Sequence, residues 1–207
     1  MLGEHVNQAV IDKVSREMGL DQPFIIQYFQ WVGKIFTGNM GYSYIKNQEV
    51  FPMFMQALPN TLLLTLSSIV TTILISIPLG IWSAVKQNKI TDYVIRVCTF
   101  IGNAMPNFFI ALLLIYVFAL QLHWFPVMGN NGFISIILPT LTLALAMSAK
   151  YTRQVRATVL DELNKDYVIG ARARGIKERT IVLAHVLKSS MLTIVTLLGL
   201  SLGSLLG

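Results

Sequence analysis

Three long stretches of the chain carry no Asp, Glu, Lys or Arg, and they cover residues 50–85, 97–149 and 189–207. A helix that crosses a bilayer needs about 20 mainly apolar residues. The first and last stretches each hold one such helix. The middle stretch is too long for one span and is interrupted by polar, proline and glycine residues near 121–132, so it holds two. The pattern predicts an all-α polytopic bundle of transmembrane helices, with spans at 58–85, 94–122, 133–150 and 189–207.

The N-terminal region, residues 1–57, is more polar and is predicted to be helical and to lie outside the bilayer core. Asp21, Gln22 and Pro23 are a typical helix start. The apolar and aromatic residues that follow, up to Phe36, would suit the membrane interface. Such a region needs a preceding span for its delivery, and Gly207 closes an apolar run. We therefore expect the sequence to be a fragment that lacks a first span and a C-terminal part.

Composition agrees with a membrane protein, and charge gives the orientation. Hydrophobic residues make up 54% of the chain and charged residues 13%, against about 25% charged residues in soluble domains. Lys and Arg concentrate in residues 86–96 and 150–188 and are absent from 121–132. Because cytoplasmic loops collect Lys and Arg, the first two segments are predicted to be cytoplasmic, and 121–132 and 1–57 extracytoplasmic. The net charge of +6 thus indicates topology and contact with membrane lipid, and we expect no nucleic-acid partner.

The sequence carries no pattern typical of an enzyme or a metal centre. It has no Gly-x4-Gly-Lys-Ser/Thr phosphate loop, so it cannot hydrolyse ATP by that route. His5, His123 and His185 fall in three different regions, and Cys98 is the only cysteine. We therefore expect no catalytic residue, no metal site and no cofactor bound by this chain.

Two amides flank a proline within the second predicted span. Asn103, Met105 and Asn107 surround Pro106, and amides in lipid are costly and usually face the interior of a bundle. These three residues are candidates for a translocation pathway. The alternative is that the amides only satisfy backbone groups freed by a kink at Pro106.

The most informative segment is the basic, helix-compatible stretch 166–175, which ends at Gly175, a residue suited to a left-handed helix C-cap. The chain resembles the permease subunits of ABC importers, in the branch for oligopeptides, dipeptides and nickel. The general family signature, Glu-Ala-Ala-x3-Gly-x9-Ile-x-Leu-Pro, is degraded here. The pattern of this branch is matched directly by Asp166, Tyr167, Val168, Ala171, Arg172, Ala173, Arg174, Gly175, His185 and Leu187.

The resemblance implies that this helix docks on a separate nucleotide-binding subunit and carries its motion into the spans. The residues to which it assigns this coupling are Asp166, Tyr167, Gly170, Ala171, Arg172, Ala173, Arg174 and Gly175. Small side chains there would allow close approach, and the arginines would offer bidentate contacts to carboxylates. The implied partners are a second homologous permease, two ATP-binding subunits that use ATP and Mg²⁺, and an extracytoplasmic substrate-binding protein, in a bacterial or archaeal inner membrane.

Two other classes of function stay open at this stage. An ion-coupled secondary transporter or channel would need ionisable groups within its spans, and the charge-free stretches contain only His123, at an outer boundary. A non-transporting assembly subunit could use the same basic loop for docking. For the cargo, overall similarity favours nickel over peptides.

Overall fold

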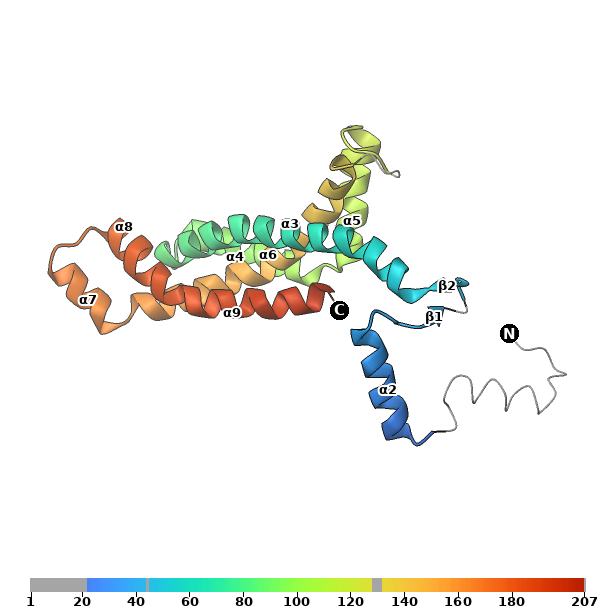
Figure 1. The fold of residues 1–207 in the computed structure, drawn as a ribbon. Coiled ribbons are helices and arrows are strands. Elements are labelled where there is room, and N and C mark those ends of the chain that lie inside the picture. The colour runs from blue at the N-terminus through green and yellow to red at the C-terminus, as the bar shows by residue number, and fades with distance from the viewer. Residues whose placement is uncertain (1–21, 44, 128–131, 207) are drawn as a thin grey trace, which may run out of the picture. The chain divides into compact units, whose positions relative to one another are not determined.

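The computed structural model describes residues 22–43, 45–127 and 132–206. It is almost entirely helical (Figure 1), which confirms the predicted fold class. By their contacts the residues form two compact units, divided between Pro59 and Asn60. The elements are α2 (Phe24–Phe36), β1 (Tyr42–Ser43), β2 (Gln48–Glu49), α3 (Val50–Val85), α4 (Ile90–Ala104), α5 (Asn107–Leu114), η1 (Ile115–Gln121), α6 (Ile134–Leu163), α7 (Asp166–Ala173), α8 (Glu178–Thr180), η2 (Ile181–Val186) and α9 (Leu187–Leu206).

The N-terminal unit contains the predicted amphipathic helix and a small hairpin that was not predicted. Helix α2 begins directly after Pro23, as expected, and leaves large apolar side chains open, with Phe24 81% and Phe36 87% exposed. Strands β1 and β2 pair antiparallel, with Tyr42 opposite Glu49. The part of the predicted helical region before Gln22, including Asp21, lies outside the described residues.

Among the residues that the structure describes, three helices are long and apolar enough to cross a membrane: Val50–Val85, Ile134–Leu163 and the continuous run Glu178–Gly203. A fourth candidate is the bent pair formed by Ile90–Ala104 and Asn107–Gln121. The described residues thus hold three candidate spans, or four if the bent pair is one span, against the four predicted. The first ends at Val85 as predicted, whereas other boundaries differ. Helix α3 begins eight residues before the predicted residue 58, and the last candidate span begins at Glu178 instead of residue 189.

Two corrections concern the predicted span at 94–122 and the loop at 150–188. The first is not one straight helix, because its two halves meet at an angle of 104°. Pro106 has no N–H to continue the helix and holds the preceding Met105 in an extended conformation, with ψ 130°. The second is not a loop from residue 150, because α6 continues to Leu163 as one helix whose buried positions recur at Val155 and Val159.

Small residues let α3 and α6 approach closely. The buried face of α3 carries Ser68, Thr72 and Ser76, spaced four residues apart, followed by Gly80. A Cβ atom built on Gly80 would lie 2.6 Å from Cγ1 of Val155 on α6. Ser67 of α3 also shares a hydrogen bond of 2.9 Å with Thr140 of α6. Small side chains on facing helices are the usual means of close packing in membranes, where the hydrophobic effect does not drive helices together.

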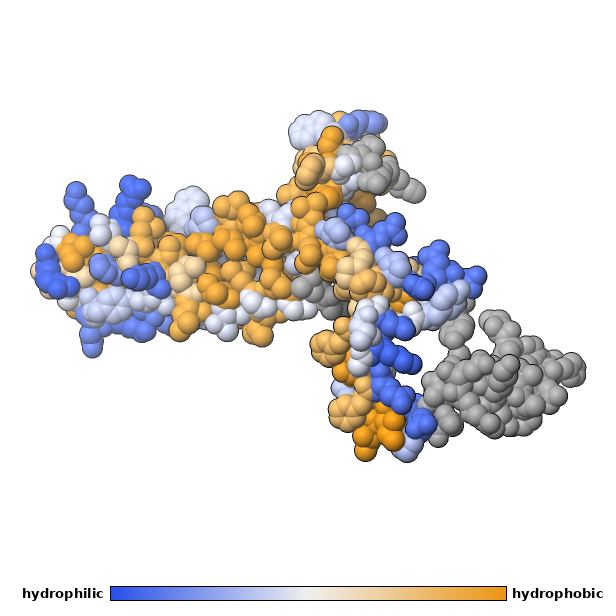
Figure 2. All heavy atoms as spheres, in the orientation of Figure 1, coloured by the Kyte–Doolittle hydropathy of each residue, from blue (hydrophilic) through white to orange (hydrophobic). Residues whose placement is uncertain are grey.

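The C-terminal unit has an apolar body and a polar end (Figure 2). Apolar side chains cover the outside of α3, α4, α6 and α9, while the end formed by α7 and α8 is largely hydrophilic. Leu74 of α3 and Leu192 of α9 are examples of these apolar side chains and are 69% and 80% exposed. Exposed apolar surface of this extent is typical of a face that contacts lipid or other membrane helices.

Candidate coupling site

The predicted coupling segment, residues 166–175, forms a short helix followed by a tight turn. Helix α7 begins at Asp166, and Gly175 adopts the left-handed conformation, with φ 74°. Its N–H donates to Arg172 O at 2.9 Å, and the N–H of Ile176 donates to Ala171 O at 3.2 Å. This pair of bonds is the Schellman arrangement that closes a helix on a left-handed glycine. The predicted C-cap role of Gly175 is therefore confirmed.

One face of α7 is anchored in the core of the C-terminal unit. Val168 is fully buried and Ala171 is 3% exposed. Both belong to one apolar cluster with residues of α3, α6, η2 and α9, namely Ala84, Val155, Val159, Ile181, Val186 and Ile194. The Ala171 side chain is therefore packed against its own chain, and its role in coupling stays a prediction.

The other face of α7 is open. Asp166, Gly170, Ala173 and Arg174 are all exposed, and a Cβ atom added to Gly170 would meet nothing within 4 Å. This face combines small and polar side chains on a helix held rigidly from behind. It can accept a protein surface at short range.

Arg172 is already engaged within the chain. Its Nε and Nη2 donate to Oε2 and Oε1 of Glu178 at 3.0 and 2.6 Å. The sequence predicted that the Arg172 guanidinium would bind a carboxylate of a partner, but in this structure it is already paired with Glu178. The physical reason is the turn at Gly175, which reverses the chain and brings Glu178 beside α7. The neighbouring carboxylate of Glu178 raises the pKa of Arg172 further above its ordinary value.

A second small network ties the start of α7 to the end of α6. Lys165 Nζ and Tyr167 Oη donate to the two carboxylate oxygens of Glu162 at 2.6 and 2.9 Å. Burial, and then the hydrogen bond to Glu162, raise the pKa of the Tyr167 phenol. The hydrogen bond to Glu162 likewise raises the pKa of the Lys165 ammonium. Tyr167, predicted to contact an ATPase subunit, thus also fixes the angle between two helices of its own chain.

A buried ion pair that the sequence reasoning missed joins α4 to α6. Asp92 is fully buried near the start of α4 and accepts two hydrogen bonds of 2.7 Å from Arg156. It also accepts bonds from the Ser83 hydroxyl at 2.5 Å and the Asn88 N–H at 3.0 Å. One carboxylate therefore connects α3, the turn after it, α4 and α6. The one feature of the sequence that pointed to Asp92 is its place in the first turn of a helix, where the helix dipole favours a carboxylate.

The predicted pathway residues lie at the 104° bend. Asn103 is in the last turn of α4, Met105 is at the break, and Asn107 opens α5. Met105 is half-buried and both asparagines are exposed. The bend therefore places two amides where an apolar helix is interrupted. Their role as pathway residues stays a prediction.

We expect Gly175→Ala to destabilise the coupling segment by about 1 kcal/mol, because a Cβ atom disfavours the left-handed conformation. Thermal unfolding of the detergent-solubilised protein would measure the change. Gly170→Ala is the matched control, since it adds the same atom to open space on a regular helix. It should be neutral or slightly stabilising. Equal losses in the two variants would show that the conformation of Gly175 is not what holds the turn.

Two family descriptions match the chain. Residues 76–207 match the family described as binding-protein-dependent transport system inner membrane component. Residues 1–65 match the N-terminal domain that accompanies that component.

Similar proteins cover the whole chain. The oligopeptide transport system permease protein AppB of Bacillus subtilis is 38% identical over 100% of this chain and 69% of its own length. The glutathione transport system permease protein GsiC of Escherichia coli K12 is 35% identical over 99% of this chain and 67% of its own. A putative peptide permease protein of Brucella ovis is 34% identical, over 98% and 67%. The chain belongs to the family of multi-pass inner-membrane permeases of binding-protein-dependent ABC importers, in its peptide branch.

Proposed function

We propose that this chain forms half of the translocation pathway of an ATP-driven peptide importer and that its coupling segment receives the motion of an ATP-binding subunit. The observation that carries the proposal is the two-sided character of α7. Its exposed face can seat against another protein, while Val168 and Ala171 lie in a cluster shared with α3, α6 and α9. A displacement of α7 would therefore be transmitted to three candidate spans at once, because packed interiors transmit strain.

The partners follow from this family. We infer two ATP-binding subunits, which would use ATP and Mg²⁺, a second homologous permease, and an extracytoplasmic substrate-binding protein. In this arrangement residues 86–96 and 150–188 face the cytoplasm, and 1–57 and 121–132 face the exterior. The basic residues of the first two segments support that orientation.

For the cargo, we infer peptides instead of nickel. The similar proteins are named for oligopeptides, peptides and glutathione, and none of those reported above is named for nickel. Within the described residues no group of three or more His, Cys, Asp or Glu could hold a metal ion. Asn103, Met105 and Asn107 are the residues we propose for the pathway wall, because the bend at Pro106 interrupts the helix there.

Uptake in proteoliposomes tests the proposal. The complex, reconstituted with its binding protein, should accumulate a labelled short peptide only when ATP is supplied on the side of the ATP-binding subunits. Labelled nickel serves as the comparison cargo. Peptide uptake without ATP would indicate a secondary transporter. ATP hydrolysis by an assembled complex that moves neither cargo would indicate an assembly subunit.

The pair between Arg172 and Glu178 gives a sharper prediction about coupling. Arg172→Glu should lower the amount of peptide imported per ATP hydrolysed severalfold, because like charges would push α7 away from the start of the last span. The double variant Arg172→Glu/Glu178→Arg should recover most of the loss. The pair is half exposed, so its effect on stability itself should stay within about 1 kcal/mol.

Arg174→Glu is the matched comparison for this charge swap. Arg174 directly follows α7 as its C-cap, is exposed, and makes no ion pair with any residue that the structure describes. If Arg174→Glu also lowers the amount of peptide imported per ATP, adding Glu178→Arg should not restore it. If Glu178→Arg restored coupling in both Arg172→Glu and Arg174→Glu, the effect would come from overall charge and not from a specific pair between Arg172 and Glu178.

A further inference from the structure

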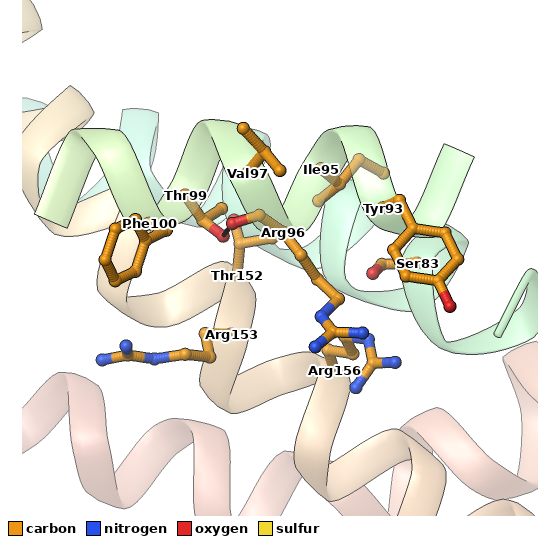
Figure 3. A pocket seen from close by; sticks show the side chains of 10 residues that line it. All are labelled: Ser83, Tyr93, Ile95, Arg96, Val97, Thr99, Phe100, Thr152, Arg153 and Arg156. Atoms are coloured by element: carbon orange, nitrogen blue, oxygen red, sulfur yellow. Dashed lines mark hydrogen bonds between the residues drawn. The ribbon is translucent and has the colours of Figure 1, made fainter. Parts of the chain in front are cut away.

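Away from the coupling segment, a pocket of about 380 Å³ opens between α4 and α6. Figure 3 shows its lining. The Arg96 side chain extends from α4 toward Arg156 on α6, and Arg153 extends from the same stretch of α6. Three guanidinium groups therefore line one cavity, which concentrates positive charge there.

The charge of this pocket is only partly balanced. Arg156 is neutralised by its two bonds to Asp92. Arg96 lies over the ring of Tyr93, 5.7 Å from its centre. Neither Arg96 nor Arg153 forms an ion pair with a carboxylate in the part of the chain that the structure describes. The pocket therefore has a surplus of positive charge that an anion would balance.

A buried hydroxyl on the pocket wall also lacks a partner. Thr152 is 1% exposed, and its Oγ1 makes no hydrogen bond to any described residue. A buried polar atom is normally satisfied. An anionic oxygen seated among the arginines would supply the missing acceptor.

Part of the pocket wall is apolar and exposed, although Ser83, Tyr93 and Thr99 also line it. Val97 and Phe100 line it and are 57% and 70% exposed. Arginines beside exposed apolar side chains match a phospholipid, with a phosphate at the guanidinium groups and an acyl chain along the helix. The predicted orientation of residues 86–96 places the arginines at the cytoplasmic leaflet, where basic pockets between helices bind anionic headgroups.

We propose that this pocket binds the phosphate headgroup of an anionic phospholipid from the cytoplasmic leaflet, held by Arg96, Arg153 and Thr152. The lipid would lie directly beside the pair that joins α4 to α6, because Arg156 belongs to both features. The stability of this part of the bundle should then depend on the headgroup charge of the surrounding lipid.

Native mass spectrometry of the assembled complex with added phosphatidylglycerol or phosphatidylcholine tests the proposal. Arg96→Ala/Arg153→Ala should lower the retention of phosphatidylglycerol roughly tenfold. Lys86→Ala/Lys89→Ala is the control, since it removes two cations from the same predicted membrane side outside the pocket. Neither variant should change the weak retention of phosphatidylcholine.

Thr152→Val separates lipid binding from folding. It keeps the shape of the side chain and removes an unpaired hydroxyl, so the protein should be as stable as before or more so. Retention of phosphatidylglycerol should nevertheless fall by about threefold. Equal retention in the arginine variant and the lysine control would overturn the proposal. Displacement of the lipid by inorganic phosphate or by peptide cargo would also overturn it, because the pocket would then be a free-anion or cargo site.

Discussion

Replacing Asp92 with Ala is expected to destabilise the protein by about 3 kcal/mol, because it leaves the Arg156 guanidinium largely buried without its carboxylate. Arg156 is 18% exposed and Asp92 is fully buried. The variant would also leave the Ser83 hydroxyl and the Asn88 N–H without their acceptor. Thermal unfolding in detergent should show a decrease in Tm of roughly 10 °C.

Two further variants identify the cause of that loss. Asp161→Ala removes an exposed carboxylate from α6 and should change stability by no more than about 0.5 kcal/mol. Asp92→Ala/Arg156→Met removes both charges and should recover most of the stability, since an apolar pair often replaces a buried ion pair at little cost. If Asp92→Ala/Arg156→Met were as unstable as Asp92→Ala, the unpaired charge of Arg156 would not be the cause of the lost stability.

The second large effect is expected at Gly80. Gly80→Ala places a Cβ atom 2.6 Å from Cγ1 and 2.7 Å from Cβ of Val155, and 3.0 Å from the backbone oxygen of Thr152. The side chain of Val155 is 1% exposed and has little room to move, so α3 and α6 must separate. Overpacking of this kind costs about 1–3 kcal/mol. The same thermal unfolding experiment should show the loss, together with reduced assembly of the complex.

Matched variants are available for this prediction. Gly199→Ala adds the same methyl group to α9, where nothing lies within 4 Å of it. It should be neutral or stabilising, because alanine favours a helix more than glycine does. Gly80→Ala/Val155→Ala makes room for the new atom and should be more stable than Gly80→Ala alone. Equal losses from Gly80→Ala and Gly199→Ala would contradict close packing of α3 on α6.

Hydropathy located the apolar helices but predicted most of their ends poorly. Absence of charge marks residues that tolerate lipid, whereas a helix ends where the backbone must turn. Helix α6 therefore continues past Lys150 to Leu163, through residues that favour a helix and bury Val155 and Val159. A kink at Pro106 was predicted from the sequence, because proline holds the residue before it in an extended conformation, but its angle of 104° was not.

The site was predictable where its cause is local. Gly175 closes α7 through its own conformation and a turn within the segment, and the sequence indicated both. The pair between Arg172 and Glu178 depends on that same turn, so it could have been inferred from it. Asp92 and Arg156 are 64 residues apart, and only the packing of α4 on α6 brings them together. No spacing in the sequence encodes that contact.

In the proposed complex, an ATP-binding subunit holds the exposed face of α7. Site-directed cross-linking tests it most directly, with cysteine placed at Ala173 in a Cys98→Ser background, where Cys98 is the only native cysteine. We predict that Ala173→Cys cross-links to an ATP-binding subunit in the assembled complex and that the yield changes when ATP is bound. Labelling of Ala173→Cys from the exterior, or the absence of any cross-link in a complex that still imports peptide, would show that this face does not bind an ATP-binding subunit.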